Sequence, residues 1–151
     1  MTENTTAHNS LASTSRWAAA VRAQESQRPD ALFVDPWAAA LAGQEGAYWI
    51  QNRGGNVAPM TIRTCYFDDY LERVVRREGS DRDEAAETKI RQIVLVGAGL
   101  DTRAYRLNWP AGTCIYELDQ PAVLLYKQHV LDDANAKPTC MRRAVAADLA
   151  A

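Results

Sequence analysis

The second half of the chain carries short apolar runs separated by amphipathic stretches, which predicts β-strands joined by helices. The consecutive apolar residues Ile93 to Val96 predict a strand that is covered on both faces. Thr113 to Asp119 predicts a second strand, and Met141 to Ala147 predicts a weaker third strand. A short helix that Asp101 can cap follows the first strand, and a helix with Pro121 in its first turn runs to about Leu131. The order βαβαβ predicts a parallel, doubly wound sheet with right-handed crossovers.

In the first half, apolar residues recur at helical spacing. Ser13 or Thr14 can cap a first helix that runs to about Gln27, and Asp35 can cap a second helix that ends near Gly43. After a predicted flexible loop at residues 51–58, Pro59 opens a third helix to about Arg77. Its predicted apolar stripe consists of Ile62, Tyr66, Tyr70 and Val74.

The same pattern divides the chain into three regions. Residues 1–12 are polar and predict a disordered tail. Residues 13–89 form the N-terminal helical region, which ends in the charged run GSDRDEAAETK. Residues 90–151 read as the first half of a doubly wound α/β domain, because such a sheet needs further strands beyond its first one.

Composition excludes several classes of protein. The chain has 151 residues, a formal net charge of -2 and a pI near 5.7, which gives no support for nucleic-acid binding. It shows neither a run of transmembrane length nor a signal peptide at its start, so we expect a cytoplasmic protein without a membrane partner. The cysteines Cys65, Cys114 and Cys140 are widely spaced, which predicts reduced thiols that are mostly buried. His8 and His129 lie too far apart to support a histidine metal site, and no metal is predicted.

The candidate site lies where the predicted strands end. Gly97 and Gly99 leave room for a cofactor to lie against the turn after the first strand. Asp119 follows Gly99 by 20 residues, where a carboxylate can accept hydrogen bonds from ribose hydroxyls, and Asp148 ends the third strand. The NAD fingerprint expects a third glycine where Thr102 stands, so an NAD site is disfavoured but not excluded.

Each of these residues also has a structural reading. The glycines can serve only a tight turn, and Asp119 can be solvated or cap the following helix. For Asp101 a helix cap is favoured over a ligand. Arg103 and Arg106 can bind an anion or simply be solvated.

Six blocks of sequence resemble the leucine carboxyl methyltransferase-like family, in particular its bacterial branch of S-adenosyl-L-methionine-dependent methyltransferases. The blocks are RWAAAVRAQES at 16–26, LFVDPWAA at 32–39, IRTCYFDDYL at 62–71, GAGLDTRAYRL at 97–107, YELDQPAVLLYKQ at 116–128 and RRAVAADL at 142–149. The resemblance implies a Rossmann-like class I methyltransferase fold and S-adenosyl-L-methionine as cofactor. It further implies that Gly97 contacts the cofactor, Asp119 holds the ribose, Asp148 and Leu149 lie beside the adenine, and Arg63 pairs with the methionine carboxylate.

The resemblance also implies a chain of about twice this length, so we interpret the sequence as truncated. The expected reaction is O-methylation of a carboxylate or hydroxyl on a small molecule, with no catalytic residue assignable on the acceptor side. The alternatives are a non-catalytic remnant and, less favoured, an NAD-binding domain. Without a fourth strand, the edge of the strand at Ile93 to Val96 stays open, so we expect self-association and little or no methyl transfer.

Overall fold

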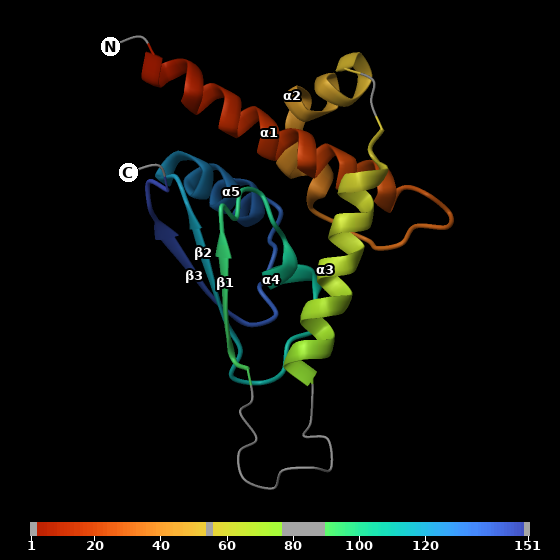
Figure 1. Cartoon of the computed structure of the whole chain (residues 1–151), viewed down its shortest axis with the longest axis vertical. Helices are drawn as coiled ribbons and strands as arrows, with labels where there is room; N and C mark the ends of the chain where they lie inside the picture. Colours follow the sequence, from red (N-terminus) through yellow and green to blue (C-terminus); the bar gives the residue numbers. More distant parts are fainter. Residues whose placement is uncertain (1–2, 54–55, 77–89, 150–151) are drawn as a thin grey trace, which may run out of the picture.

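The chain folds into one three-stranded sheet and five helices within residues 3–53, 56–76 and 90–149, which the computed structural model describes (Figure 1). The helices are α1 (Glu3–Ser26), α2 (Ala38–Arg53), α3 (Ala58–Arg76), α4 (Arg103–Arg106) and α5 (Pro121–Asp133). The strands are β1 (Gln92–Val96), β2 (Cys114–Asp119) and β3 (Met141–Ala146). The predicted strands and their connecting helices are confirmed, with bounds shifted by one or two residues.

The sheet is parallel and has the order β1-β2-β3. Ile93 lies opposite Ile115, and Ile115 lies opposite Arg142, which fixes the register across all three strands. Because the strands are parallel, their carboxyl ends meet at one edge. This α/β arrangement agrees with the predicted Rossmann-like methyltransferase fold.

Only one face of the described sheet is well covered. The face that carries Ile93 and Ile115 packs under α4 and α5, where these two residues are almost fully buried. On the opposite face, Val94 is 56% exposed and Val96 is 68% exposed. The prediction that the first strand is covered on both faces is therefore wrong for the part of the chain described, because no described helix packs over Val94 and Val96.

The first two helices differ from their predicted bounds. The first one begins at Glu3 rather than at Ser13 or Thr14, so the helical backbone includes most of the tail predicted to be disordered. Residues 3–12 contain no proline or glycine that would stop a helix. The second helix continues beyond Gly43, although Gly43 interrupts it with a kink at φ 59° and ψ −167°. The predicted loop at 51–58 is accordingly shorter, and its Gly54 and Gly55 lie outside the described residues.

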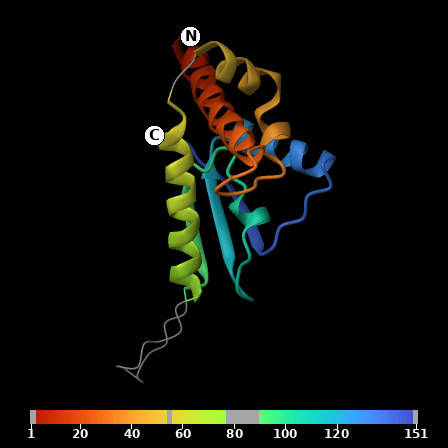
Figure 2. The same ribbon diagram turned by 90° about the vertical axis from the view of Figure 1, so that its right-hand side faces the viewer.

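The third helix matches its predicted bounds but not its predicted orientation. It runs alongside the sheet, next to β1, in both views (Figures 1 and 2). Its predicted stripe faces outward, since Ile62 is 61% exposed and Tyr66 is 58% exposed. The buried side chains are instead Thr61, Thr64, Asp68 and Val75. Helical spacing identified an apolar face, but polar contacts of Thr64 and Asp68 with the arginines of α4 help to decide which face is covered.

The core joins the helical region to the sheet. Ala19 and Leu41 from the first two helices belong to the same buried cluster as Ile93 and Ile115 from the strands. The predicted division at residues 89 and 90 stays a prediction, and the charged run before it lies outside the described residues. Among the helices that the structure describes, none combines the length and the apolar character needed to span a membrane.

Candidate functional site

A pocket of about 510 Å³ lies at the carboxyl ends of the strands. This volume is within the ordinary range for small-molecule sites, about 300–1,000 Å³. Its walls come from α1, α3, the loop after β1, and the ends of β2 and β3. The pocket thus lies where a ligand binds in open α/β sheets.

All six residues predicted for the cofactor site line this one pocket. They are Arg63, Gly97, Gly99, Asp119, Asp148 and Leu149. They come from four separate segments of the chain, so their convergence is a property of the fold. Their individual roles in ligand binding stay predictions.

The turn after β1 needs glycine for conformational reasons. Gly97 has a φ of +66°, and Gly99 has a φ of +50°, a region in which side chains are strained. A Cβ on Gly97 would meet nothing within 4 Å, whereas a Cβ on Gly99 would lie 3.2 Å from the Cβ of Ser15. Gly97 therefore borders open space in the pocket, and Gly99 allows the close approach of α1.

Asp119 ties the end of β2 to the glycine turn. Its Oδ2 accepts a hydrogen bond from the Gly99 N–H at 2.6 Å, and its Oδ1 accepts one from the Gln120 N–H at 2.7 Å. A carboxylate offers about four lone-pair sites, so two remain for other donors. Asp119 thus has a structural role beside its predicted ligand role: it holds the glycine turn, and it bonds the N-cap residue of the following helix, close to the capping alternative.

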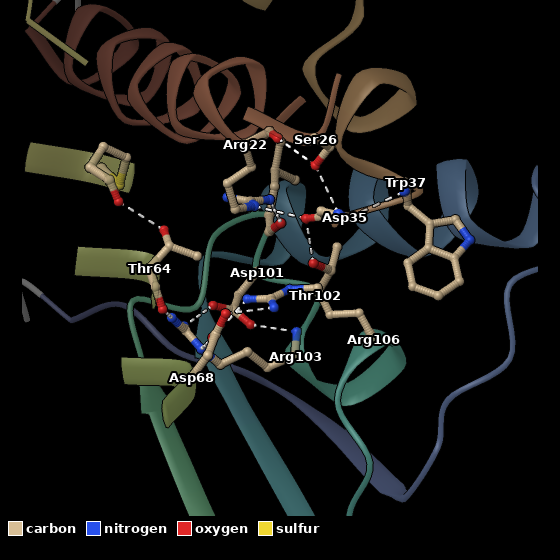
Figure 3. Close-up of polar contacts among 12 residues, drawn as sticks. Arg22, Ser26, Asp35, Trp37, Thr64, Asp68, Asp101, Thr102, Arg103 and Arg106 are labelled. Carbon is tan, nitrogen blue, oxygen red and sulfur yellow. Dashed lines mark hydrogen bonds and ion pairs between the residues drawn. The ribbon is translucent and has the colours of Figure 1, made fainter. Parts of the chain in front are cut away.

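The first helix forms one wall of the pocket through Ser15, Ala18 and Arg22. The Arg22 guanidinium donates to Asp35 Oδ2 at 2.8 Å and to the Leu100 carbonyl at 2.6 Å (Figure 3). This buried pair fastens the helix to the loop that follows the glycines.

Asp35 completes this connection (Figure 3). Its Oδ2 also accepts the hydroxyl of Thr102 at 2.6 Å, and its Oδ1 accepts the Trp37 N–H at 3.2 Å. The second contact agrees with the predicted capping role. Thr102, at the position of the missing third glycine, therefore anchors the glycine turn to the start of the second helix.

A second ion-pair network joins α3 to α4 (Figure 3). Arg103 contacts Asp101 and donates to Asp68 Oδ1 at 2.7 Å, and Arg106 lies 2.6 Å from Asp68 Oδ2. The N-cap of α4 is Thr102 rather than the predicted Asp101, but Asp101 Oδ1 accepts the first N–H of the helix, that of Arg103, at 2.8 Å. The solvated alternative for Arg103 and Arg106 is wrong, since acids from two segments neutralise both side chains.

The three cationic side chains that line the pocket differ in their partners. Arg22 and Arg103 are bound to carboxylates, as described above. Arg63 is exposed, and its guanidinium forms no hydrogen bond or ion pair within residues 3–53, 56–76 and 90–149. Arg63 is thus available to an anionic group of a ligand.

A third charged cluster lies in the core and was not predicted. Glu117 and Lys127 are both fully buried, with Lys127 Nζ 2.7 Å from Glu117 Oε2, and Arg142 lies 2.8 Å from the same oxygen. Burial lowers the pKa of Lys127, and Glu117 opposes that shift. One signal was present in the sequence: Lys127 interrupts an otherwise apolar face of its helix, and Glu117 alternates with Ile115 on its strand.

Neither the histidines nor the cysteines form a reactive centre in the described parts of the chain. No group of His, Cys, Asp and Glu side chains there could hold a metal ion. The three thiols are free, as predicted, but only Cys114 is buried. Burial raises the pKa of Cys140 to about 11, which disfavours its nucleophilic thiolate at neutral pH.

Comparison with known proteins agrees with this geometry. Residues 15–151 match the leucine carboxyl methyltransferase family. The chain belongs to this family. A curated family relative from Mycobacterium sp. (strain KMS) is 40% identical over 157 aligned residues and is named "Putative S-adenosyl-L-methionine-dependent methyltransferase". A relative of the same description from Mycobacterium tuberculosis (strain ATCC 25618 / H37Rv) is 38% identical over 155 residues.

The alignments cover 93% of this chain in both cases. They cover 49% of the first relative and 48% of the second. The chain therefore spans about half the length of the curated relatives it matches. In this family member, that half contains the glycine turn and the three strand ends.

Proposed function

We propose that the chain binds S-adenosyl-L-methionine across the carboxyl ends of its strands and forms the cofactor-binding part of a methyltransferase. The observation that carries the proposal is the pocket that the glycine turn, the strand-end acids and the exposed Arg63 all line. Family membership supports the same cofactor and favours it over NAD. Titration calorimetry with S-adenosylhomocysteine tests the proposal, with NAD as the comparison ligand; binding of NAD alone would contradict it.

We assign the pocket residues to the chemical groups of the cofactor by their order across the sheet. Figure 1 shows β3, β2, β1 and α3 in succession. The proposal accordingly assigns Asp148 and Leu149 after β3 to the adenine, and Asp119 at the end of β2 to the ribose. Gly97 then lies under the cofactor after β1, and Arg63 on α3 takes the methionine carboxylate. An arginine suits that role because its planar guanidinium binds a carboxylate in a two-pronged geometry.

The residues present fit the cofactor on three counts. Gly97 leaves open space where a ligand can approach the backbone. Asp119 retains acceptor capacity after its two backbone hydrogen bonds. Arg63 offers a cation without a partner in the described part of the chain. Together these features supply a hydrogen-bond acceptor for the ribose, open space for the cofactor against the backbone, and a positive charge for its carboxylate.

The proposed reaction is O-methylation of a carboxylate or hydroxyl on a small molecule. When bound, the cofactor supplies a methyl group on a sulfonium centre, and the chain's own residues bind and orient it. The runner-up is a chain that binds the cofactor and transfers no methyl group. Methyl transfer to candidate acceptors, measured beside cofactor binding, separates the two. Cytoplasmic location and self-association through the β1 edge stay predictions.

Replacing Gly97 by alanine tests the cradle. We expect the variant to lose about 1 kcal/mol of stability, because alanine is strained at positive φ. We also expect at least about tenfold weaker binding of S-adenosylhomocysteine, because the added methyl group projects toward the ligand, and tenfold corresponds to about 1.4 kcal/mol. Urea unfolding and calorimetry measure the two effects.

Gly112 provides a matched control. Its φ is +80°, a Cβ there would also meet nothing within 4 Å, and it does not line the pocket. Gly112→Ala should reproduce the loss of stability without the loss of affinity. Equal affinity losses in both variants would contradict a direct role for Gly97.

Replacing Arg63 by alanine tests the assignment of the carboxylate. We expect Arg63→Ala to weaken binding of S-adenosylhomocysteine by about tenfold or more, the effect of losing one charge-assisted hydrogen bond. Binding of adenosine should be nearly intact, because adenosine has no carboxylate. Calorimetry with both ligands makes the comparison.

Arg73 on the same helix is the control, since it does not line the pocket and its Nε donates only to the carbonyl of Asp69. Arg73→Ala should leave both affinities unchanged. If Arg63→Ala weakens adenosine as strongly as S-adenosylhomocysteine, Arg63 acts on the fold rather than on the carboxylate.

A further inference from the structure

We propose that Asp101 binds the α-ammonium group of the cofactor's methionine part, beside Arg63. This inference rests on the proposed function and adds the ligand group that the six predicted residues leave without a partner. The strand before the glycine turn, QIVLV, contains no acid that could take the ammonium group. Asp101 follows that turn directly and lines the pocket.

The carboxylate of Asp101 has acceptor capacity to spare. Its Oδ1 accepts the Arg103 N–H at 2.8 Å, and its Oδ2 contacts the guanidinium of the same residue. About two of its four lone-pair sites remain open. Its side chain is 19% exposed, so the carboxylate is partly sheltered from water but still reachable from the pocket.

Asp101 is ionised at neutral pH. Burial alone would raise the pKa of its carboxyl. The positive charges of Arg103, Lys127 and Arg22 together outweigh that effect, so the pKa of Asp101 lies below its ordinary value. Although Arg103 is its ion-pair partner, Asp101 therefore stays an anionic carboxylate in the pocket wall. An ammonium group is the part of the cofactor that complements it in both charge and hydrogen-bond donors.

Arg103 also links Asp101 to the turn of α3 that carries Arg63. The guanidinium of Arg103, which contacts Asp101, reaches the carbonyl of Thr64 at 3.5 Å. Thr64 follows Arg63 directly on α3, and both line the pocket. An acid and the turn that carries Arg63 thus border the same pocket, which suits a group that carries an ammonium and a carboxylate on a single carbon.

The alternative is that Asp101 serves only Arg103 and the start of the short helix. Asp101→Asn separates the two roles, because asparagine keeps an oxygen for the Arg103 N–H and removes the charge. Asp68→Asn is the matched control. Asp68 is the other carboxylate bound to Arg103, and it does not line the pocket.

The experiment is titration calorimetry of the 151-residue chain with two ligands: S-adenosylhomocysteine and its analogue in which hydrogen replaces the amino group. We expect the wild-type chain to prefer S-adenosylhomocysteine by about 10- to 100-fold, the range for one hydrogen bond between charged groups. Asp101→Asn should abolish this preference, and the analogue should bind within about twofold of wild type. Asp68→Asn should keep the preference, and thermal melting checks that each variant is folded.

Several outcomes would overturn the inference. If the wild-type chain binds both ligands equally well, this inference is wrong, whereas the proposed function still stands. That comparison needs no variant, so it does not depend on a variant being folded. Equal weakening of both ligands in Asp101→Asn, or loss of the preference in Asp68→Asn, would assign Asp101 to Arg103 alone. If the wild-type chain binds neither ligand, the proposed function fails and this inference fails with it.

Discussion

Asp119→Ala is expected to weaken binding of S-adenosylhomocysteine by about a hundredfold. Hydrogen bonds to a charged group contribute about 1.5–3 kcal/mol each, and the proposed ribose contact contains up to two of them. The substitution also removes the acceptor of the Gly99 N–H, which helps to hold the glycine turn. Calorimetry measures the affinity, and urea unfolding measures any accompanying loss of stability.

The two roles of Asp119 can be separated by Asp119→Asn. Asparagine can still accept the Gly99 N–H through its oxygen, but it has one acceptor oxygen instead of two and no charge. We expect Asp119→Asn to retain most of the stability and still lose most of the affinity. An Asp119→Ala variant that binds S-adenosylhomocysteine like the wild type would refute the ribose assignment.

Glu117→Gln is expected to lower the free energy of unfolding by about 3–5 kcal/mol, the usual cost of removing one partner from a buried ion pair. Glu117 faces two cations, Lys127 and Arg142, so its loss removes the one carboxylate that contacts both of them. Urea unfolding of variant and wild type measures the difference.

Lys127→Met is the informative comparison. It removes one of the two cations and leaves Glu117 paired with Arg142, so the remaining charges balance. Methionine is also apolar and of similar length, which suits the buried position. We expect Lys127→Met to cost clearly less than Glu117→Gln. If Lys127→Met lowers the free energy of unfolding more than Glu117→Gln does, the cluster of Glu117, Lys127 and Arg142 does not carry the excess of positive charge that its geometry indicates.

The strands could be located from the sequence because their signal is local. A run such as Ile93 to Val96 is too apolar to be exposed as a whole and too short for a helix, so its bounds follow closely. The outward face of the third helix could not be located, since its apolar residues satisfy the helical period whether or not anything covers them. What buries Thr64 and Asp68 instead is a contact with arginines of the short helix, which no local pattern records.

The same distinction applies to the site. The glycine turn and Asp119 were predictable because parallel strands end at one edge of the sheet. The topology alone therefore brings the turn and the acid together, independently of the side chains in the intervening segment. Arg63 was identified only by resemblance, because one arginine on a helix has no distinctive spacing. The links from Asp35 to Arg22 and to Thr102 were missed because they join residues far apart along the chain, and a single sequence carries no signal for such pairs.

Ser15 and Ala18 of α1 form one wall of the pocket, so the affinity for a ligand depends on whether α1 is packed against the rest of the protein. A ligand that needs this wall binds only those protein molecules in which α1 is packed in place. Its apparent dissociation constant is therefore the intrinsic constant divided by the fraction of molecules in that state. Substitutions far from the ligand that loosen the helix would then change affinity and leave every ligand contact intact. Conversely, ligand binding would hold the helix in place, and the two ends of the described chain would become thermodynamically linked.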